Sequence, residues 1–150
     1  MRFPLILILT ASVLTVPAAA AQAAPPLCTA DVIEQTLLGS GNLTQDEIDA
    51  DAGVNLIRCG DVTGDGATDA VFTVASGGTA GDISFGVIEG GADGAGEVVL
   101  FKDGYKIGIA RHDSRSFDVL QPYYGKTDPN CCPSSSNCWA TWDMTQPCRI

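Results

Sequence analysis

The most regular spacing of oxygen-bearing side chains in the chain lies between positions 61 and 69, in the stretch Asp-Val-Thr-Gly-Asp-Gly-Ala-Thr-Asp. Ca²⁺ takes about six to eight oxygen ligands, and the loops that bind it space such side chains around a glycine at a tight turn. The residues that fit this pattern are Asp61, Thr63, Asp65 and Asp69. A turn without metal is the other interpretation, because Asp65-Gly66 suits a connection between two strands that needs positive φ. Calcium is thus the one candidate cofactor.

The single histidine of the chain lies in Arg111-His112-Asp113, and an acid beside an imidazole is typical of a general base and the group that orients it. Nucleophilic catalysis also needs a positioned serine, and the chain has no Gly-x-Ser-x-Gly sequence. We therefore predict no catalytic residue. A secreted hydrolase or inhibitor, with a site that only the fold assembles, remains an alternative.

The six cysteines predict three disulfides, because an even count in an exported chain is typical of a bridged framework. They are Cys28, Cys59, Cys131, Cys132, Cys138 and Cys148. Cys131 and Cys132 are adjacent, and a bridge between neighbours is strained, so we expect each to pair elsewhere. Cys138 and Cys148 flank a short segment and are expected to pair with each other. Cys28 and Cys59 then pair with Cys131 and Cys132, in an order that the sequence leaves open.

The N-terminus predicts export. Residues 1–23 have the three parts of a signal peptide, which are a positive Met1-Arg2, an apolar run over 5–16 and the small-x-small sequence Ala21-Gln22-Ala23. We place the cut after Ala23, so that residues 24–150 form a secreted, disulfide-stabilised domain. Leu27 stands before the first cysteine where a lipidation signal needs a small residue, so we expect no lipid anchor.

The negative charge of the chain excludes some classes of binding partner. A formal net charge of −10 argues against nucleic acid, since a phosphate backbone requires a cationic surface. Beyond the N-terminus no apolar run is long enough to predict a membrane span. We expect a monomer whose ligand is an unidentified envelope or extracellular component.

Periodicity predicts an α+β fold, in which short N-terminal helices pack on an antiparallel β meander with a disulfide-bridged C-terminal cap. The first helix is expected over 29–39 and ends at Gly39, and Thr44-x-x-Glu47 opens the second with a capping box. Asp103-Gly104 predicts a hairpin turn. Alternation of apolar and polar residues predicts strands over 54–59, 68–75, 83–89, 97–102, 105–111 and 116–121.

The C-terminal tail, residues 122–150, has little periodicity and predicts an irregular cap that ends in a short hairpin. Its aromatic residues are Tyr123, Tyr124, Trp139 and Trp142. Exposed aromatic rings can stack on sugars or on partner side chains. Packing beside the bridges as a small second core is the interpretation that we favour.

Three segments together resemble the LppP/LprE-type lipoproteins and related secreted proteins of bacterial envelopes. They are the Cys-Gly-Asp-Val-Thr-Gly-Asp-Gly stretch at 59–66, the glycine-rich loop at 76–82 and Asp-Pro-Asn-Cys-Cys-Pro-Ser at 128–134. The resemblance implies an envelope location and a small disulfide-bonded domain, and it transfers no catalytic residue. The sequence thus predicts a secreted, cell-envelope-associated, non-enzymatic domain with a binding or structural role. The alternative is a calcium-stabilised binding module that uses the loop at 61–69.

Overall fold

The computed structural model describes residues 26–91, 95–111, 113, 115–122, 124–129 and 138–143, the last of these as backbone only. These residues form two short helices and seven strands. The helices are α1 (Ala30–Ser40) and α2 (Gln45–Asp49). The strands are β1 (Gly53–Gly60), β2 (Asp69–Ala75), β3 (Asp82–Gly90), β4 (Gly96–Asp103), β5 (Gly108–Arg111), β6 (Ser116–Gln121) and β7 (Cys138–Asp143).

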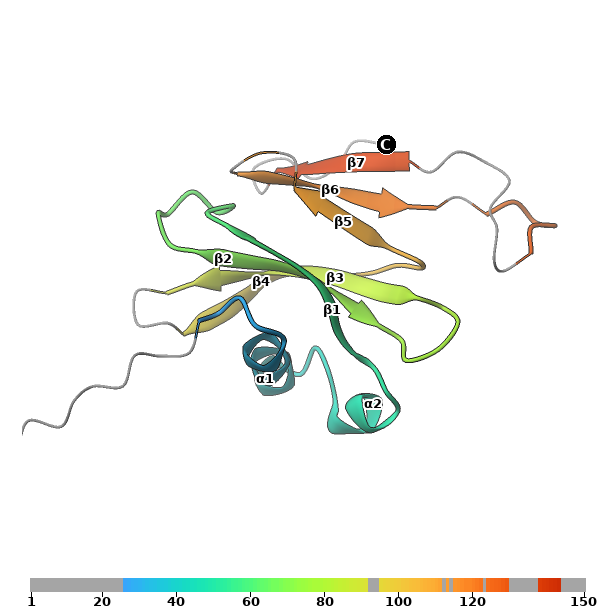
Figure 1. The fold of residues 1–150 in the computed structure, drawn as a ribbon, viewed down its shortest axis with the longest axis horizontal. Helices are drawn as coiled ribbons and strands as arrows, with labels where there is room; N and C mark the ends of the chain where they lie inside the picture. Colours follow the sequence, from blue (N-terminus) through green and yellow to red (C-terminus); the bar gives the residue numbers. More distant parts are fainter. Residues whose placement is uncertain are drawn as a thin grey trace, which may run out of the picture.

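The strands form two antiparallel sheets, each in sequence order. One has the order β1-β2-β3-β4 and the other β5-β6-β7. The helices cover one face of the first sheet, and the second sheet lies over its other face, so that the fold has three layers (Figure 1). The predicted α+β class and antiparallel meander are confirmed. The division of the meander into two stacked sheets was not predicted.

Strand β2 lies at the centre of the molecule because both of its faces are covered. Phe72 and Val74 pack with the helix-side core, whereas Val71 packs with the core between the sheets. A strand that is buried on both faces has an almost continuous apolar sequence, as the run from Ala70 to Val74 does. Phe85 and Phe117 join the two sheets through an edge-to-face contact with ring centroids 6.4 Å apart.

Helix α1 exists because Ile33 and Leu37, one turn apart, are fully buried against the first sheet. The predicted end at Gly39 is wrong. The helix continues to Ser40 and ends at Gly41, whose φ of 75° is the left-handed conformation that glycine adopts without strain. The N–H of Gly41 donates to the carbonyl groups of Leu37 and Leu38, and the N–H of Asn42 also donates to the Leu37 carbonyl, at 3.0 Å.

Helix α2 confirms its capping box. The Thr44 hydroxyl accepts from the backbone N–H of Glu47 at 3.3 Å, and the Glu47 carboxylate accepts from the backbone N–H of Thr44 at 2.8 Å. The Thr44 hydroxyl also donates to this carboxylate at 2.7 Å. The side-chain bond first, and then the backbone bond, lowers the pKa of Glu47 below its ordinary value.

The predicted hairpin at Asp103-Gly104 is wrong. Strand β4 pairs with β3 and β5 pairs with β6, so the connection between β4 and β5 crosses from one sheet to the other. Its backbone is held by β3 instead, because Gly104 N–H donates to the Ile83 carbonyl at 2.7 Å. Lys106 has a left-handed φ of 50°, and Ile107 then enters the core between the sheets.

The segment after position 137 extends the second sheet. Strand β7 pairs antiparallel with β6, with Trp139 opposite Leu120 and Trp142 opposite Phe117. The tail therefore contributes a strand to a sheet, which differs from the predicted irregular cap. The predicted closing hairpin lies outside the described residues, as does the predicted signal peptide over 1–23. Among the described residues, no helix combines the length and apolar character needed to cross a membrane.

Candidate functional site

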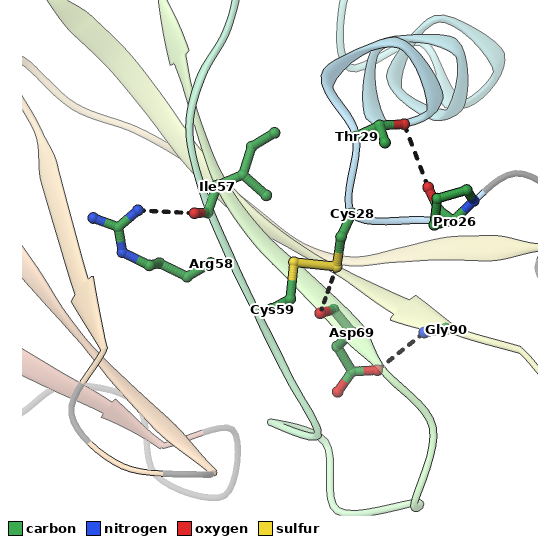
Figure 2. Close-up of a disulfide and its surroundings, with 8 residues drawn as sticks. All are labelled: Pro26, Cys28, Thr29, Ile57, Arg58, Cys59, Asp69 and Gly90. Carbon is green, nitrogen blue, oxygen red and sulfur yellow. Dashed lines mark hydrogen bonds between the residues drawn. A yellow bond between two sulfur atoms is a disulfide. The ribbon is translucent and has the colours of Figure 1, made fainter.

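The disulfide of the described chain joins Cys28 and Cys59, with their Cα atoms 6.2 Å apart (Figure 2). The predicted pairing of these two cysteines with Cys131 and Cys132 is therefore wrong. Cys28 lies two residues before α1 and Cys59 is the second-last residue of β1, so the bridge joins the start of α1 to the end of β1. The remaining cysteines, Cys131, Cys132, Cys138 and Cys148, have side chains outside the described residues.

Asp69 lies next to this disulfide and is fully buried. Its carboxylate accepts three backbone N–H bonds. One oxygen takes those of Val62 and Thr63 at 2.8 Å each, and the other takes that of Gly90 at 3.0 Å. Its own carbonyl oxygen lies 3.8 Å from Cys28 Sγ (Figure 2). Asp69 thus ties the loop after β1 to the end of β3.

The other residues of the candidate calcium loop are placed differently. Asp61 accepts from the N–H of Gly64 at 2.7 Å, and Asp65 accepts from the N–H of Ala67 at 2.7 Å, as expected of aspartates in turns. The Thr63 hydroxyl is buried and has no hydrogen-bond partner among the described residues. Nowhere in the described chain do three or more His, Cys, Asp or Glu side chains gather in a way that suits a metal ion. The turn interpretation accounts for the carboxylates, and calcium binding stays a prediction.

The other candidates from the sequence are only partly described. His112 and Tyr123 lie outside the described residues, as do the side chains of Trp139 and Trp142. Tyr124 meets Tyr105 edge to face with ring centroids 5.4 Å apart, and Lys106 Nζ lies 5.6 Å from the Tyr124 ring. The sequence did not indicate Tyr105 as the partner of Tyr124. Both tyrosines are half-buried, and the predicted packing of the tail aromatics beside the bridges stays a prediction.

A groove of about 850 Å³ runs between α1 and the first half of β4. On the helix side it is lined by a stripe at helical spacing, which consists of Val32, Gln35, Thr36 and Gly39. On the sheet side it is lined by Gly96, Glu97 and Val98. Val32 and Val98 pack against the helix-side core, so the floor of the groove is apolar.

Two glycines that line the groove, Gly39 and Gly96, differ in their surroundings. A Cβ atom at Gly39 would have no atom within 4 Å, so this position of α1 borders open space. A Cβ atom at Gly96 would lie 2.4 Å from Ile88 and 2.8 Å from Leu27, so Gly96 packs closely against these two side chains of the helix-side core. Leu27, the residue before Cys28, thus packs beside the start of β4.

The hydroxyl groups that line the groove are already engaged as donors. Thr36 donates to the Val32 carbonyl at 2.8 Å, Ser40 to the Leu37 carbonyl at 3.1 Å and Thr29 to the Pro26 carbonyl at 3.3 Å. The described lining contains no histidine, cysteine or lysine that would activate a hydroxyl or act as a nucleophile. An apolar surface with a few fixed polar groups is typical of ligand sites in proteins.

The electrostatic character of the groove is negative. Asp31 and Glu97 line it, and a second cavity of about 300 Å³ shares Gly96 and Glu97 with it. That cavity adds Asp65 and Glu89, and no Lys, Arg or His lines either cavity among the described residues. Glu89 and Glu97 are also directly opposite each other on β3 and β4. Like charges in this position destabilise a sheet, so a cation in the cavity would relieve their repulsion.

Sequence patterns did not indicate this groove, because its two sides are about sixty residues apart in the chain and share no motif. The one sequence signal was the interrupted alternation in Glu97-Val98-Val99-Leu100, which marks an irregular strand. The chain matches no family model, no curated protein and no solved structure.

Proposed function

We propose that this protein is exported and acts as a cell-envelope-associated, non-enzymatic domain that binds a ligand in the groove between α1 and β4. The observation that carries this proposal is the groove itself, which is open, apolar at its floor and lined by hydroxyls that already donate to backbone carbonyls. The signal-peptide pattern over 1–23 and the resemblance to LppP/LprE-type lipoproteins support the location. The disulfide between Cys28 and Cys59 supports it as well, since disulfides persist in oxidising compartments.

Export is tested by expressing the full chain in a bacterial host and sequencing the N-terminus of the processed product. We expect the product outside the cytoplasmic membrane, beginning at Ala24. An unprocessed N-terminus in the cytoplasmic fraction would contradict the proposed location.

Binding is tested with a pair of variants at Gly39. Because a Cβ atom there meets nothing within 4 Å and the backbone needs no positive φ, the helix accommodates a larger side chain without strain. Gly39→Trp fills the groove, and Gly39→Ala is the matched control. We expect immobilised Gly39→Ala protein to retain envelope components that Gly39→Trp protein does not retain. Equal retention by both variants would show that the groove is not the binding site.

A further inference from the structure

The sheet side of the groove is formed by β4, an edge strand among the described strands. Strand β4 is the last strand of its sheet and, in the part of the chain that the structure describes, pairs with β3 alone. The backbone groups on the other side of an edge strand can pair with an extended chain. Helix α1 stands beside this edge and contacts β4, so a chain added there would lie in the groove.

A β-bulge limits how much of this edge can accept another strand. Val87 is opposite Leu100 and Ile88 is opposite Val98, so Val99 has no counterpart on β3. The extra residue reverses the alternation, because Val98 packs with the helix-side core and Leu100 with the core between the sheets. Val99 is left exposed. Regular strand geometry along the groove is therefore confined to Gly96–Val98.

The two faces of this short edge differ in chemistry. Gly96 and Val98 border the apolar floor of the groove, beside α1. Glu97 also borders the groove, but it alternates with these two residues, so its side chain points toward the opposite face of the sheet, where Glu89 is its neighbour across the strands. A strand added to β4 would meet apolar surface with every second side chain and carboxylates with the others.

From these features we propose that the free edge of β4 binds an extended peptide segment in which basic and apolar residues alternate. The peptide backbone pairs with Gly96–Val98, its apolar side chains enter the groove against α1, and its Lys or Arg side chains reach the carboxylates of Glu97 and Glu89. This inference rests on the proposed function, since it names the ligand class of the same groove. A basic segment is also complementary to a chain of net charge −10.

The test uses labelled Lys-Val-Lys-Val-Lys-Val peptide and the exported, processed protein in fluorescence anisotropy. Glu-Val-Glu-Val-Glu-Val peptide, and a basic peptide with N-methyl groups on alternate backbone nitrogens, are the control ligands. We expect one-to-one binding of the basic peptide alone, because the acidic peptide is repelled and the methylated one cannot form the strand hydrogen bonds. Binding of the methylated peptide with equal affinity would overturn the strand addition.

Protein variants test the location of the peptide. Glu97→Gln is expected to weaken binding about two- to fivefold, as for a partly exposed ion pair, and Gly39→Trp to abolish it. Asp103→Asn removes the same charge from the exposed far end of β4 and should leave the affinity unchanged. Equal effects of Glu97→Gln and Asp103→Asn on the affinity would overturn the proposal. A stable dimer in analytical ultracentrifugation, in which a second copy of the protein covers the edge of β4, would overturn it as well. If the peptide fails to bind while Gly39→Trp still blocks capture of envelope components, this inference fails and the proposed function stands.

Discussion

Replacing Asp69 is expected to destabilise the protein more than replacing any other acid of its loop. In Asp69→Ala the N–H groups of Val62, Thr63 and Gly90 lose their acceptor. A buried donor without a partner costs about 1–3 kcal/mol. Val62 and Gly90 are buried, so we count two donors in full, whereas Thr63 is half-buried and water can replace part of its bond. The expected loss is about 3–5 kcal/mol of the free energy of unfolding, which is a large part of the total for a domain of this size.

The matched control is Asp65→Ala, in the same loop. Asp65 is exposed and accepts one bond, from Ala67, so we expect a loss within about 1 kcal/mol. The loss of unfolding free energy in Asp69→Asn should lie between those of the two alanine variants. The amide oxygen can keep both loop N–H bonds, while the NH₂ group faces the N–H of Gly90. Urea unfolding of the three variants at one pH, with the slopes compared, measures these differences.

The same variants test the calcium hypothesis. We expect the difference in the free energy of unfolding between Asp69→Ala and Asp65→Ala to be the same in EDTA and in millimolar Ca²⁺, because the carboxylate of Asp69 is held by backbone N–H groups. Equal losses for the two variants would refute the structural role that we assign to Asp69. Stabilisation of the natural protein by Ca²⁺ that both alanine variants abolish would establish the loop as a metal site.

Three further predictions concern the disulfide, the capping box and the helix. Trypsin digestion without reduction should join the peptide 24–58 to 59–102, as the Cys28–Cys59 bond requires, whereas a link from either to 127–149 would contradict it. Glu47 has a lowered pKa, so its capping contribution to stability is complete above the ordinary glutamate pKa and is lost as the pH falls through the lowered value. In an NMR titration, the carboxyl of Glu47 and the amide of Thr44 should change with the same midpoint. Separate midpoints would argue against the capping box. Gly39→Ala should raise the free energy of unfolding by about 0.5–1 kcal/mol through helix propensity. Gly77→Ala should lower it, since φ is 71° there and a Cβ atom would lie 2.6 Å from the Ala50 carbonyl oxygen. Thermal unfolding of both variants measures whether stability rises or falls in each.

The sequence predicted those parts of the fold that depend on neighbouring residues. The capping box needs only Thr44 and Glu47, and both of its bonds are present. The alternation of apolar residues located β1–β4 and β6 to within a few residues, because burial on one or both faces of a strand determines where apolar residues occur in its sequence. Two glycines, Gly39 and Gly41, lie near the end of α1, and either could end the helix. Only the position of the last buried turn shows that Gly41 does so.

Features that depend on distant residues were predicted poorly. Asp103-Gly104 has the composition of a hairpin turn, but Ile107 is buried between the sheets, and this tertiary contact draws the chain away from β4. The pairing of Cys28 with Cys59 follows from where α1 lies on the first sheet, which no spacing of cysteines encodes. The groove has the same origin, since its two sides come together only after α1 has packed.

The disulfide and the groove are parts of one arrangement. Cys28 fixes the start of α1 to the end of β1, and Leu27, the residue before it, then occupies the space above Gly96 where a Cβ atom would collide with it. The disulfide and the buried Leu27 thus lie together where the start of α1 meets the sheet, while Gly39, near the end of α1, borders open space. A bond that closes a loop of this length stabilises the folded domain by about 3–4 kcal/mol, mainly by constraining the unfolded chain, and it adds to the burial of Ile33 and Leu37 against the first sheet. If the proposed ligand binds here, a groove whose walls are already ordered lowers the entropic cost of binding.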